Sequence, residues 1–453
     1  MSAARSQPPH VAQTRTSVPE PEHLAGTHAG THADTGPQPS TAARPAVDAV
    51  QRRTMTVLVL TQIIGTVGVG VAPSIGILLA GAVTDNEAWA GLARTASTLG
   101  AALLGLPLGT LAARRGRRVA LAGGWWTAAV GAAVLVAAAQ WSLIVPLFGG
   151  LLLIGAGLAV SLQSRFAATD LAQPHHKARS LALIVWVGTL GSVLGPNLGV
   201  PGEIIGAATG LTVYASAFLI AALCLAVAGL VVWLWLRPDP LLFLEREAPA
   251  GLGGRQPGRI RQVLAELRVN RRARVAVIAI LTAQIVMVGI MTMTPVHLTH
   301  HGGSITLVGI TISMHIVGMY APAPLVGLIA DRYGHRPAIT AGLGVLAASL
   351  LIGAVKPDDT GWTITSLILL GIGWSFVNVA ASALFNAAVS TETRASSQGG
   401  VDALSNLFGA TAAFASGPLL AVSSFSLLSI VALIVLIPLG VLMAGRTLTR
   451  QNA

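Results

Sequence analysis

Long apolar stretches, separated by short polar ones, fill most of this chain after its first 50 residues. An α-helix needs about 20 mainly apolar residues to cross the hydrocarbon core of a bilayer. Twelve stretches meet that requirement, so we predict an all-α membrane protein with twelve transmembrane helices. The expected helices span residues 54–82, 88–112, 118–138, 142–168, 178–200, 209–236, 273–297, 304–329, 336–355, 361–389, 395–420 and 424–445.

The composition supports this prediction and excludes an ordinary soluble protein. Hydrophobic residues make up 53% of the chain and charged residues only 10%, whereas about a quarter of the residues of a soluble domain are charged. The single cysteine, Cys224, lies within an apolar stretch. Neither a disulfide framework nor a thiolate metal site is therefore expected.

The positions of the basic residues explain the net charge of +11. When alternate loops are assigned to opposite sides of a bilayer, nearly all of the 28 Lys and Arg residues fall on one side. The loops of the other side contain only Lys356, while Arg94 and Arg165 fall within predicted helices. Loops rich in Lys and Arg stay in the cytoplasm. We therefore expect a multi-pass protein of the cell (cytoplasmic) membrane with both termini cytoplasmic, and no nucleic-acid partner.

The chain divides into five predicted regions. Residues 1–50 are rich in Pro, Ala, Thr, Ser and His and have no apolar periodicity, which indicates a disordered cytoplasmic tail. No short apolar segment lies near Met1, so a cleavable signal peptide is not expected. The other regions are an N-terminal six-helix half (54–236), a cytoplasmic linker (237–272), a C-terminal six-helix half (273–446) and a cytoplasmic tail (447–453).

One loop sequence occurs twice, after the second and after the eighth predicted helix. Residues 109–118 read GTLAARRGRR, and residues 327–336 read GLIADRYGHR. The two copies resemble the loop signature of the major facilitator superfamily. The resemblance covers about residues 54–446 and implies the major facilitator fold, with two six-helix halves that are parallel repeats. The first copy has Ala113 where the family pattern has an aspartate, so Asp331 and Arg332 are the candidate gating or coupling pair.

Two glycine-proline pairs lie within predicted helices. Gly195-Pro196 resembles a motif of antiporters in the superfamily, and Gly417-Pro418 repeats the pair in the eleventh helix. Glycine lets helices approach closely, and proline can kink them. We expect packing or hinge roles at both positions.

Methionine and histidine form a spaced pattern in the seventh and eighth predicted helices. Met287 and Met291 are four residues apart, as are His315 and Met319. Residues at this spacing share one face of a helix, and all four are expected near the middle of the bilayer. Thioether and imidazole donors suit Cu(I). The alternative is that the methionines fill apolar packing, although a histidine in the membrane needs a polar partner.

The two pairs resemble the MxxxM and HxxxM motifs of the CcoA-like copper transporters, a branch of the same superfamily. This resemblance implies that Met287, Met291, His315 and Met319 bind copper, and that the protein imports it into the cytoplasm. Three further histidines occupy the loop between these helices, where they are candidates for outer copper capture or form an ordinary polar loop. They are His297, His300 and His301.

One acidic residue, Asp402, lies clearly within a predicted span, with Asn406 one helical turn further. Asp402 is a candidate to carry a coupling proton or to brace an inner gate. Two other functions remain open: a proton-coupled exporter of drugs or small metabolites, and a copper-binding membrane sensor or assembly factor without flux.

No nucleophile–base arrangement stands out among the few polar residues of the spans, so enzymatic activity is not expected. The predicted partners are Cu(I) as transported substrate, the lipid bilayer and a cytoplasmic copper chaperone. No permanent cofactor is expected, and a monomer is the predicted state.

Overall fold

The computed structural model describes residues 44–86, 88–173, 176–247, 267–268, 270–389 and 394–444. This part contains twelve helices that are long and apolar enough to cross a membrane, which confirms the predicted all-α fold. The spans are Val47–Thr84, Ala88–Arg115, Arg117–Trp141, Ile144–Asp170, Arg179–Thr209, Val213–Phe243, Arg271–His300, Ile305–Tyr333, His335–Val355, Thr360–Ala388, Ser397–Ala421 and Phe425–Ala444.

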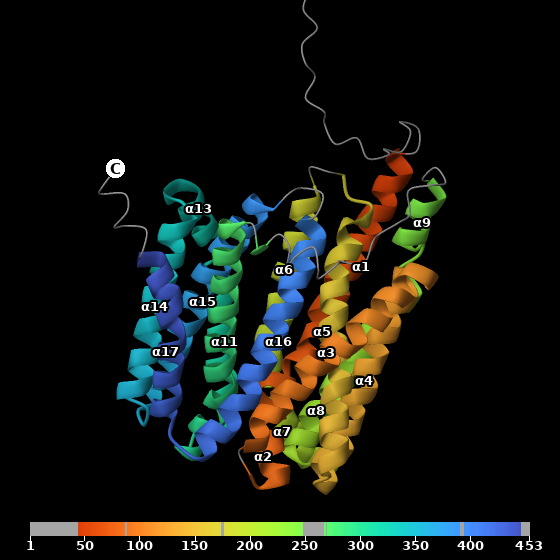
Figure 1. The fold of residues 1–453 in the computed structure, drawn as a ribbon. Helices are drawn as coiled ribbons and strands as arrows, with labels where there is room; N and C mark the ends of the chain where they lie inside the picture. Colours follow the sequence, from red (N-terminus) through yellow and green to blue (C-terminus); the bar gives the residue numbers. More distant parts are fainter. Residues whose placement is uncertain are drawn as a thin grey trace, which may run out of the picture. The chain divides into compact units, whose positions relative to one another are not determined.

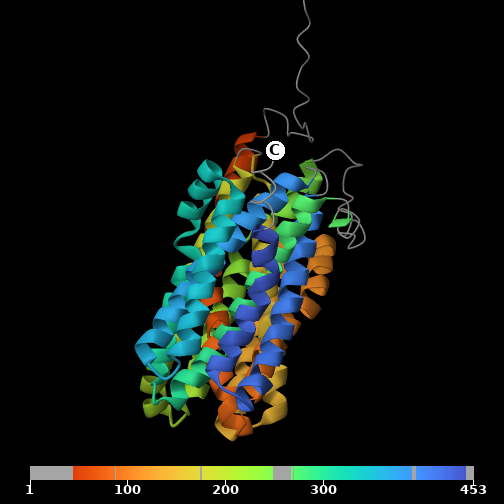
Figure 2. The ribbon, with the colours of Figure 1, turned by 60° about the vertical axis from the view of Figure 1, so that its left-hand side comes forward.

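The helices form two groups, each with its own buried cluster. One cluster is built from residues between Val57 and Leu236, and the other mainly from residues between Ala273 and Met443. The long helices of both groups run from one end of the bundle to the other (Figures 1 and 2). The first group comprises α1 (Arg44–Gly70), α2 (Ile77–Thr84), α3 (Ala88–Arg115), α4 (Arg117–Trp141), α5 (Ile144–Asp170), α6 (Lys177–Leu194), α7 (Gly199–Thr209), α8 (Val213–Trp235) and the short α9 (Pro240–Glu247). The second comprises α11 (Arg271–His300), α12 (Ile305–Tyr320), α13 (Ala323–Tyr333), α14 (His335–Val355), α15 (Thr360–Ala388), α16 (Arg394–Ala421) and α17 (Phe425–Ala444).

The first helix begins earlier than the sequence predicts. α1 starts at Arg44, so the last seven residues of the predicted disordered tail are helical and that part of the prediction is wrong. These residues extend a helix that the following apolar span has already nucleated, and extension costs little. Val47 is buried, and Gln51 donates a hydrogen bond to the carbonyl of Ala168 at 2.8 Å. The rest of that tail, residues 1–43, and the C-terminal tail lie outside the described residues.

Proline acts differently at the two predicted hinges. α6 ends at Leu194, and Gly195–Leu198 forms a 3₁₀ turn that separates it from α7. Pro196 contributes no N–H to the helix ladder, which explains the interruption. Pro418, in contrast, lies inside the continuous α16. The predicted hinge is therefore visible as a helix break only at the first position.

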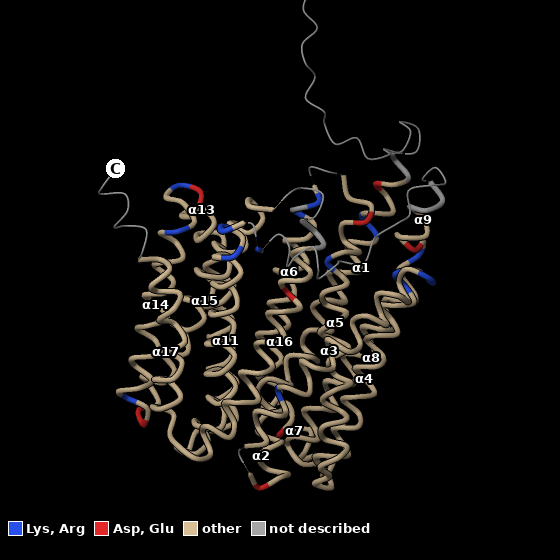
Figure 3. Tube along the Cα trace, in the orientation of Figure 1, with Lys and Arg blue, Asp and Glu red and all other residues tan. Residues whose placement is uncertain are grey.

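Charged residues gather near the helix ends (Figure 3). We call the end with α9, the loop between α3 and α4 and the loop between α13 and α14 the basic end, because most Lys and Arg residues lie there. The other end, with the loops before α3 and after α11, is the opposite end. This distribution agrees with the side that the sequence assigns to the basic loops.

The repeated loop is braced by ion pairing in its first copy. Arg117 bonds to Asp170 at 2.7 Å, and both side chains are buried, at 6% and 3% exposure. Arg117 also donates to Gln163 at 3.1 Å. The predicted pair of the second copy, Asp331 and Arg332, is exposed, and Arg332 lies 5.7 Å over the ring of Tyr333. A gating role for this second pair stays a prediction.

The start of the central linker closes over the same first loop. The carboxylate of Asp239 accepts a hydrogen bond from the backbone N–H of Arg118 at 2.7 Å. The Arg118 side chain donates to the carbonyl of Trp233 at 2.7 Å and lies 4.2 Å from the centre of its ring. Gly116 adopts φ +88° beneath Asp239, where a side chain would overlap the carboxylate. The linker is thus fixed to the first half at its beginning.

Candidate functional site

The two halves contact each other closely toward the opposite end. Gly91 of α3 packs so tightly on α16 that a side chain there would overlap the carbonyl oxygen of Ala413. Thr95, one turn further along α3, donates a hydrogen bond to the carbonyl of Ala410 at 3.0 Å. These contacts hold α3 and α16 together at the level of residues 91–95.

A second contact joins α12 to the turn that follows α6. Asn197 donates to the hydroxyl of Ser313 at 2.7 Å, and that hydroxyl donates to the carbonyl of Val193 at 2.7 Å. Ser313 lies about 12 Å along α12 from its start at the opposite end. Both links between the halves therefore lie on the side of the opposite end.

Toward the basic end, two charged side chains face each other without contact. Asp402 of α16 interacts electrostatically with Arg165 of α5. The two form no ion pair within the described part of the chain, where Arg165 Nε is buried without a partner and Asp402 is exposed. Asn406, one turn further from the basic end, is half-buried.

Between these two levels lies a cluster of polar and aromatic side chains from three helices. Trp374 of α15 donates its indole N–H to the amide oxygen of Gln284 of α11 at 3.1 Å. The ring of Tyr320 of α12 meets Trp374 edge-on, with 6.1 Å between ring centres and 70° between ring planes. All three side chains are half-buried. We call Gln284, Tyr320 and Trp374 the aromatic–amide cluster.

The cluster presents groups that suit a planar organic molecule. Aromatic faces stack on flat rings, and an amide both donates and accepts hydrogen bonds. The amide of Gln284 has room because Gly409 of α16 faces it, where a Cβ would lie 3.4 Å from Gln284 Nε2. This arrangement holds an amide and two rings near the middle of the bundle.

His315 of α12 lies nearer the opposite end than the aromatic–amide cluster and packs against α15. Its Nδ1 bonds to the carbonyl oxygen of Leu367 at 2.7 Å, and its Nε2 is buried without a partner among the described residues. A carbonyl only accepts, so Nδ1 carries the proton and the neutral ring keeps its lone pair on Nε2. The backbone allows this approach because Gly371 faces His315, where a side chain would overlap the His315 carbonyl.

The three predicted thioether ligands are buried in the hydrophobic core of the second half. Met287, Met291 and Met319 are 4%, 6% and 7% exposed. The helices that carry the two predicted pairs, α11 and α12, each pack far more extensively on α15 than on each other. The convergence of these sulfur atoms with His315 therefore stays a prediction.

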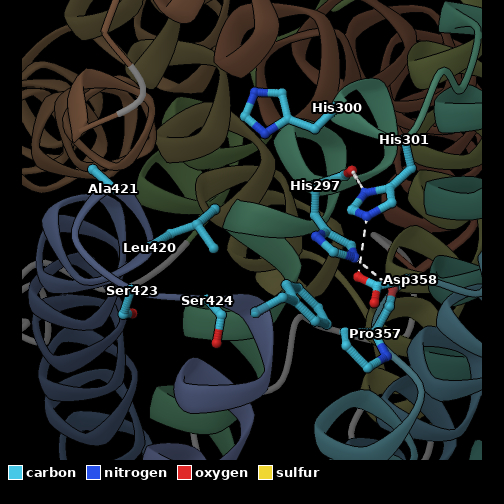
Figure 4. Close-up of a pocket in the computed structure, with 10 residues that line it drawn as sticks. His297, His300, His301, Pro357, Asp358, Leu420, Ala421, Ser423 and Ser424 are labelled. Carbon is cyan, nitrogen blue, oxygen red and sulfur yellow. Dashed lines mark hydrogen bonds and ion pairs between the residues drawn. The ribbon is translucent and has the colours of Figure 1, made fainter.

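Two of the three outer histidines, His297 and His301, bond to the loop that follows α14. His297 bonds to the carbonyl of Pro357 at 2.6 Å, and His301 bonds to Asp358 at 3.2 Å. Both rings turn toward the loop after α14, whereas His300 lies apart from them (Figure 4). They line a pocket of about 310 Å³. No group of three or more His, Cys, Asp or Glu side chains in the described part of the chain is arranged to hold a metal ion.

We expect His297→Ala to lower the free energy of unfolding by roughly 1–3 kcal/mol. The change removes the hydrogen bond to Pro357 and the stacking on Phe425, whose ring centre lies 4.4 Å away at 17°. Thermal unfolding of the purified protein measures the effect. An unchanged transition would contradict the structural role, whereas a role of these histidines in copper capture would be detected only as a change in copper uptake.

Part of this site was visible in the sequence. The sequence places Arg94 within a predicted span. Trp374 and Tyr320 were missed. The available signal was the spacing of Trp374, Asn378 and Ser382, which places one polar stripe along α15.

Comparison with known proteins identifies the relatives of the chain. It matches the family described as Major Facilitator Superfamily over residues 57–413 and again over residues 298–451. It is 36% identical over 389 residues to YddS of Bacillus subtilis, an uncharacterized MFS-type transporter, covering 84% of this chain and 87% of that protein. It is 30% identical over 401 residues to the riboflavin transporter RfnT of Brucella anthropi, covering 86% and 95%.

Solved structures share the fold at low sequence identity. The nucleoside transporter NupG superposes with a TM-score of 0.65 at 15% identity, covering 87% of this chain and 98% of that one. None of the family and sequence matches described above is specific to copper transporters.

Proposed function

The chain belongs to the major facilitator superfamily, and from that premise we propose that it is a secondary transporter for a planar, hydrogen-bonding organic solute. It would work by alternating access, with the solute held between the two six-helix halves. This is the small-metabolite function that the sequence left open beside copper import. It gives the aromatic–amide cluster a role as the binding site.

The observation that carries the proposal is the hydrogen bond and ring contact that join Gln284, Tyr320 and Trp374. Three helices contribute one residue each, and all three side chains keep part of their surface accessible. Solute sites in transporters of this kind lie near the middle of the membrane between repeats. The position of the cluster between the closed opposite end and the separated Arg165–Asp402 level agrees with such a site.

The relative RfnT suggests a first solute to test. Riboflavin is planar and heteroaromatic, with donors and acceptors along its ring edge. Stacking on Trp374 and hydrogen bonding to Gln284 would recognise that chemistry. Riboflavin is therefore the first probe for this chain, with other planar heteroaromatic compounds as competitors.

The basic end would face the cytoplasm of the cell that makes the protein. The concentration of Lys and Arg at that end supports this orientation through the positive-inside rule. Both termini would then be cytoplasmic in a cytoplasmic membrane. Asp402 would be the residue that couples solute movement to protons or closes the basic end.

Copper import is the second candidate function, and one observation favours it. His315 has its Nδ1 fixed by Leu367 and its Nε2 buried without a partner in the part of the chain that the structure describes. A backbone carbonyl often orients a metal-binding histidine in this way. Met287, Met291 and Met319 would then supply the thioethers for Cu(I) as substrate, and a cytoplasmic chaperone would receive it. A copper sensor would bind the ion without moving it.

Uptake in intact cells distinguishes these functions. Cells that produce the chain should change their accumulation of [¹⁴C]riboflavin, or of another planar heteroaromatic solute that competes with it, relative to cells with Trp374→Ala. Accumulation of ⁶⁴Cu should be the same in both. A change in ⁶⁴Cu that depends on His315 and Met287, with no change for organic solutes, would replace the first proposal by the second.

We expect Asp402→Asn to slow solute flux by about two- to fivefold, because a partly accessible ion pair contributes little more than 1 kcal/mol. We expect Asp402 and Arg165 to form this ion pair when the basic end closes, so its loss should slow the closing step. The exchange Asp402→Arg with Arg165→Asp should restore much of the rate in the same flux assay. Failure of the exchanged pair to exceed either single variant would assign Asp402 to proton coupling instead of closure.

A further inference from the structure

We propose that Arg94 is a binding subsite for an anionic group, so that the transported solute is an organic anion: an aromatic or heteroaromatic carboxylate or phosphate monoester. This inference deepens the proposed function and rests on it. It concerns a residue that the aromatic–amide cluster does not include.

The first reason is that Arg94 has no counter-ion among the described residues. It lies within the membrane span formed by α3 and is half-buried. Its side chain makes no hydrogen bond and no ion pair within the described residues. A charge inside a bilayer is costly and is usually paired or functional. An arginine held there without a carboxylate leaves its five donors available to a ligand.

The second reason is the set of groups that surround Arg94. Its electrostatic neighbours are His315 and Tyr320 of α12, neither of which has a carboxylate. Asp402 interacts with Arg165 instead. Asp402 lies about 12 Å along α16 from Ala410, the residue to which Thr95 bonds. The carboxylate of Asp402 therefore lies much nearer the basic end than Arg94 does.

The third reason is position. Arg94 lies between Gly91 and Thr95, the two residues that fix α3 on α16 where the halves meet. It is about 9 Å along α3 from the opposite end, while His315 is about 15 Å along α12. Arg94 therefore lies nearer the opposite end, where the halves meet, than the aromatic–amide cluster does.

The last reason is that one side chain of the cluster interacts electrostatically with Arg94. Tyr320 contacts Trp374 edge-on and is also an electrostatic neighbour of Arg94. A single solute can thus place its ring on the cluster and its anionic group on Arg94. Arginine suits this task because its planar fork binds a carboxylate or phosphate through two parallel hydrogen bonds.

Binding of matched solute pairs to the purified full-length protein tests the inference. The pairs are riboflavin and riboflavin 5′-phosphate, nicotinamide and nicotinate, and adenosine and adenosine 5′-phosphate. Each pair keeps its ring and differs by an anionic group. The wild-type protein should bind the anionic member of at least one pair about tenfold more tightly. Arg94→Gln should remove that preference, and Arg94→Lys should keep part of it.

Arg115→Gln is the matched control, because it removes one positive charge from the exposed end of the same helix. It should leave the preference intact. Each variant must elute as a single species, and Arg94→Lys keeps the test valid if Arg94→Gln does not fold. A preference that survives in Arg94→Gln, or its absence from all three pairs in the wild type, overturns the inference. Binding of a neutral member that depends on Trp374 would then preserve the proposed function, whereas no binding at all would end both.

Discussion

Replacing Trp374 with alanine should reduce solute binding by roughly 5- to 150-fold and bring flux close to the background of empty liposomes. Stacking of a ring on an aromatic side chain contributes about 1–3 kcal/mol. The change also leaves the amide oxygen of Gln284 without its donor at 3.1 Å and removes the ring beside Tyr320. Affinity for labelled solute and the initial rate of flux are the two measurements.

Trp362 provides the matched control for this change. It lies on the same helix, α15, and its side chain is 47% exposed near the opposite end. Trp362→Ala removes an equal volume without touching the cluster, so flux should stay near the wild-type value. Trp374→Phe should retain part of the affinity because it keeps an aromatic ring, although a smaller one that lacks the N–H. Equal losses in the Trp374→Ala and Trp362→Ala variants would contradict a binding role for Trp374.

Replacing Gly91 with alanine should lower flux by about tenfold while solute binding persists. The added Cβ would overlap the carbonyl of Ala413 and press against the backbone of Gly417 at 3.1 Å. Overpacking of this kind costs roughly 1–3 kcal/mol. The cost falls on the state in which the opposite end is closed, so the equilibrium between the two access states should shift.

The same substitution at Gly105 gives the comparison. Gly105 lies on the same helix, and a Cβ there would only reach the Cβ of Ala159 at 3.8 Å, an ordinary contact. Gly105→Ala should therefore leave flux unchanged. Labelling of a cysteine introduced at Thr95, which is half-buried in the contact with α16, should increase in Gly91→Ala and not in Gly105→Ala. Equal labelling in both variants would show that the contact at Gly91 does not close the opposite end.

The fold was predictable from sequence because its main determinants are local. Each span is an apolar stretch long enough to satisfy its own backbone hydrogen bonds in lipid, so all twelve could be located, with ends that differ from the observed spans by up to nine residues. The prediction that residues 44–50 are disordered is wrong because it considers only their own composition. A polar segment next to a strong span becomes helical through its neighbour, and the composition of residues 44–50 alone does not predict that.

The candidate site was less predictable because its residues meet only through packing. The spacing of Met287 and Met291 defines one face of a helix, but not what lies opposite that face. In the structure α15 packs against both α11 and α12, and its Trp374 joins Gln284 to Tyr320. Nothing in the spacing within one helix encodes such a three-helix contact.

The partner of Arg117 in the first loop also depends on packing between helices. The aspartate of the family pattern is absent from the first loop, where Ala113 stands, and only the second loop has it, as Asp331. The carboxylate that pairs with Arg117 comes instead from Asp170, at the end of α5. The sequence showed that a charge was missing from the loop, and only the packing of α4 on α5 revealed where its replacement lies.

Solute counterflow in proteoliposomes tests the central claim most directly, because it detects exchange through the protein without assuming a direction or a coupling ion. Liposomes that contain the purified chain are loaded with an unlabelled planar heteroaromatic solute and then exposed to a trace of the labelled form. Riboflavin, nicotinate and adenosine are tested in turn. We expect transient accumulation of label for at least one of them in the wild type, and none with Trp374→Ala. No accumulation for any of the three, together with exchange of ⁶⁴Cu that depends on His315, would contradict the proposed transport of an organic solute.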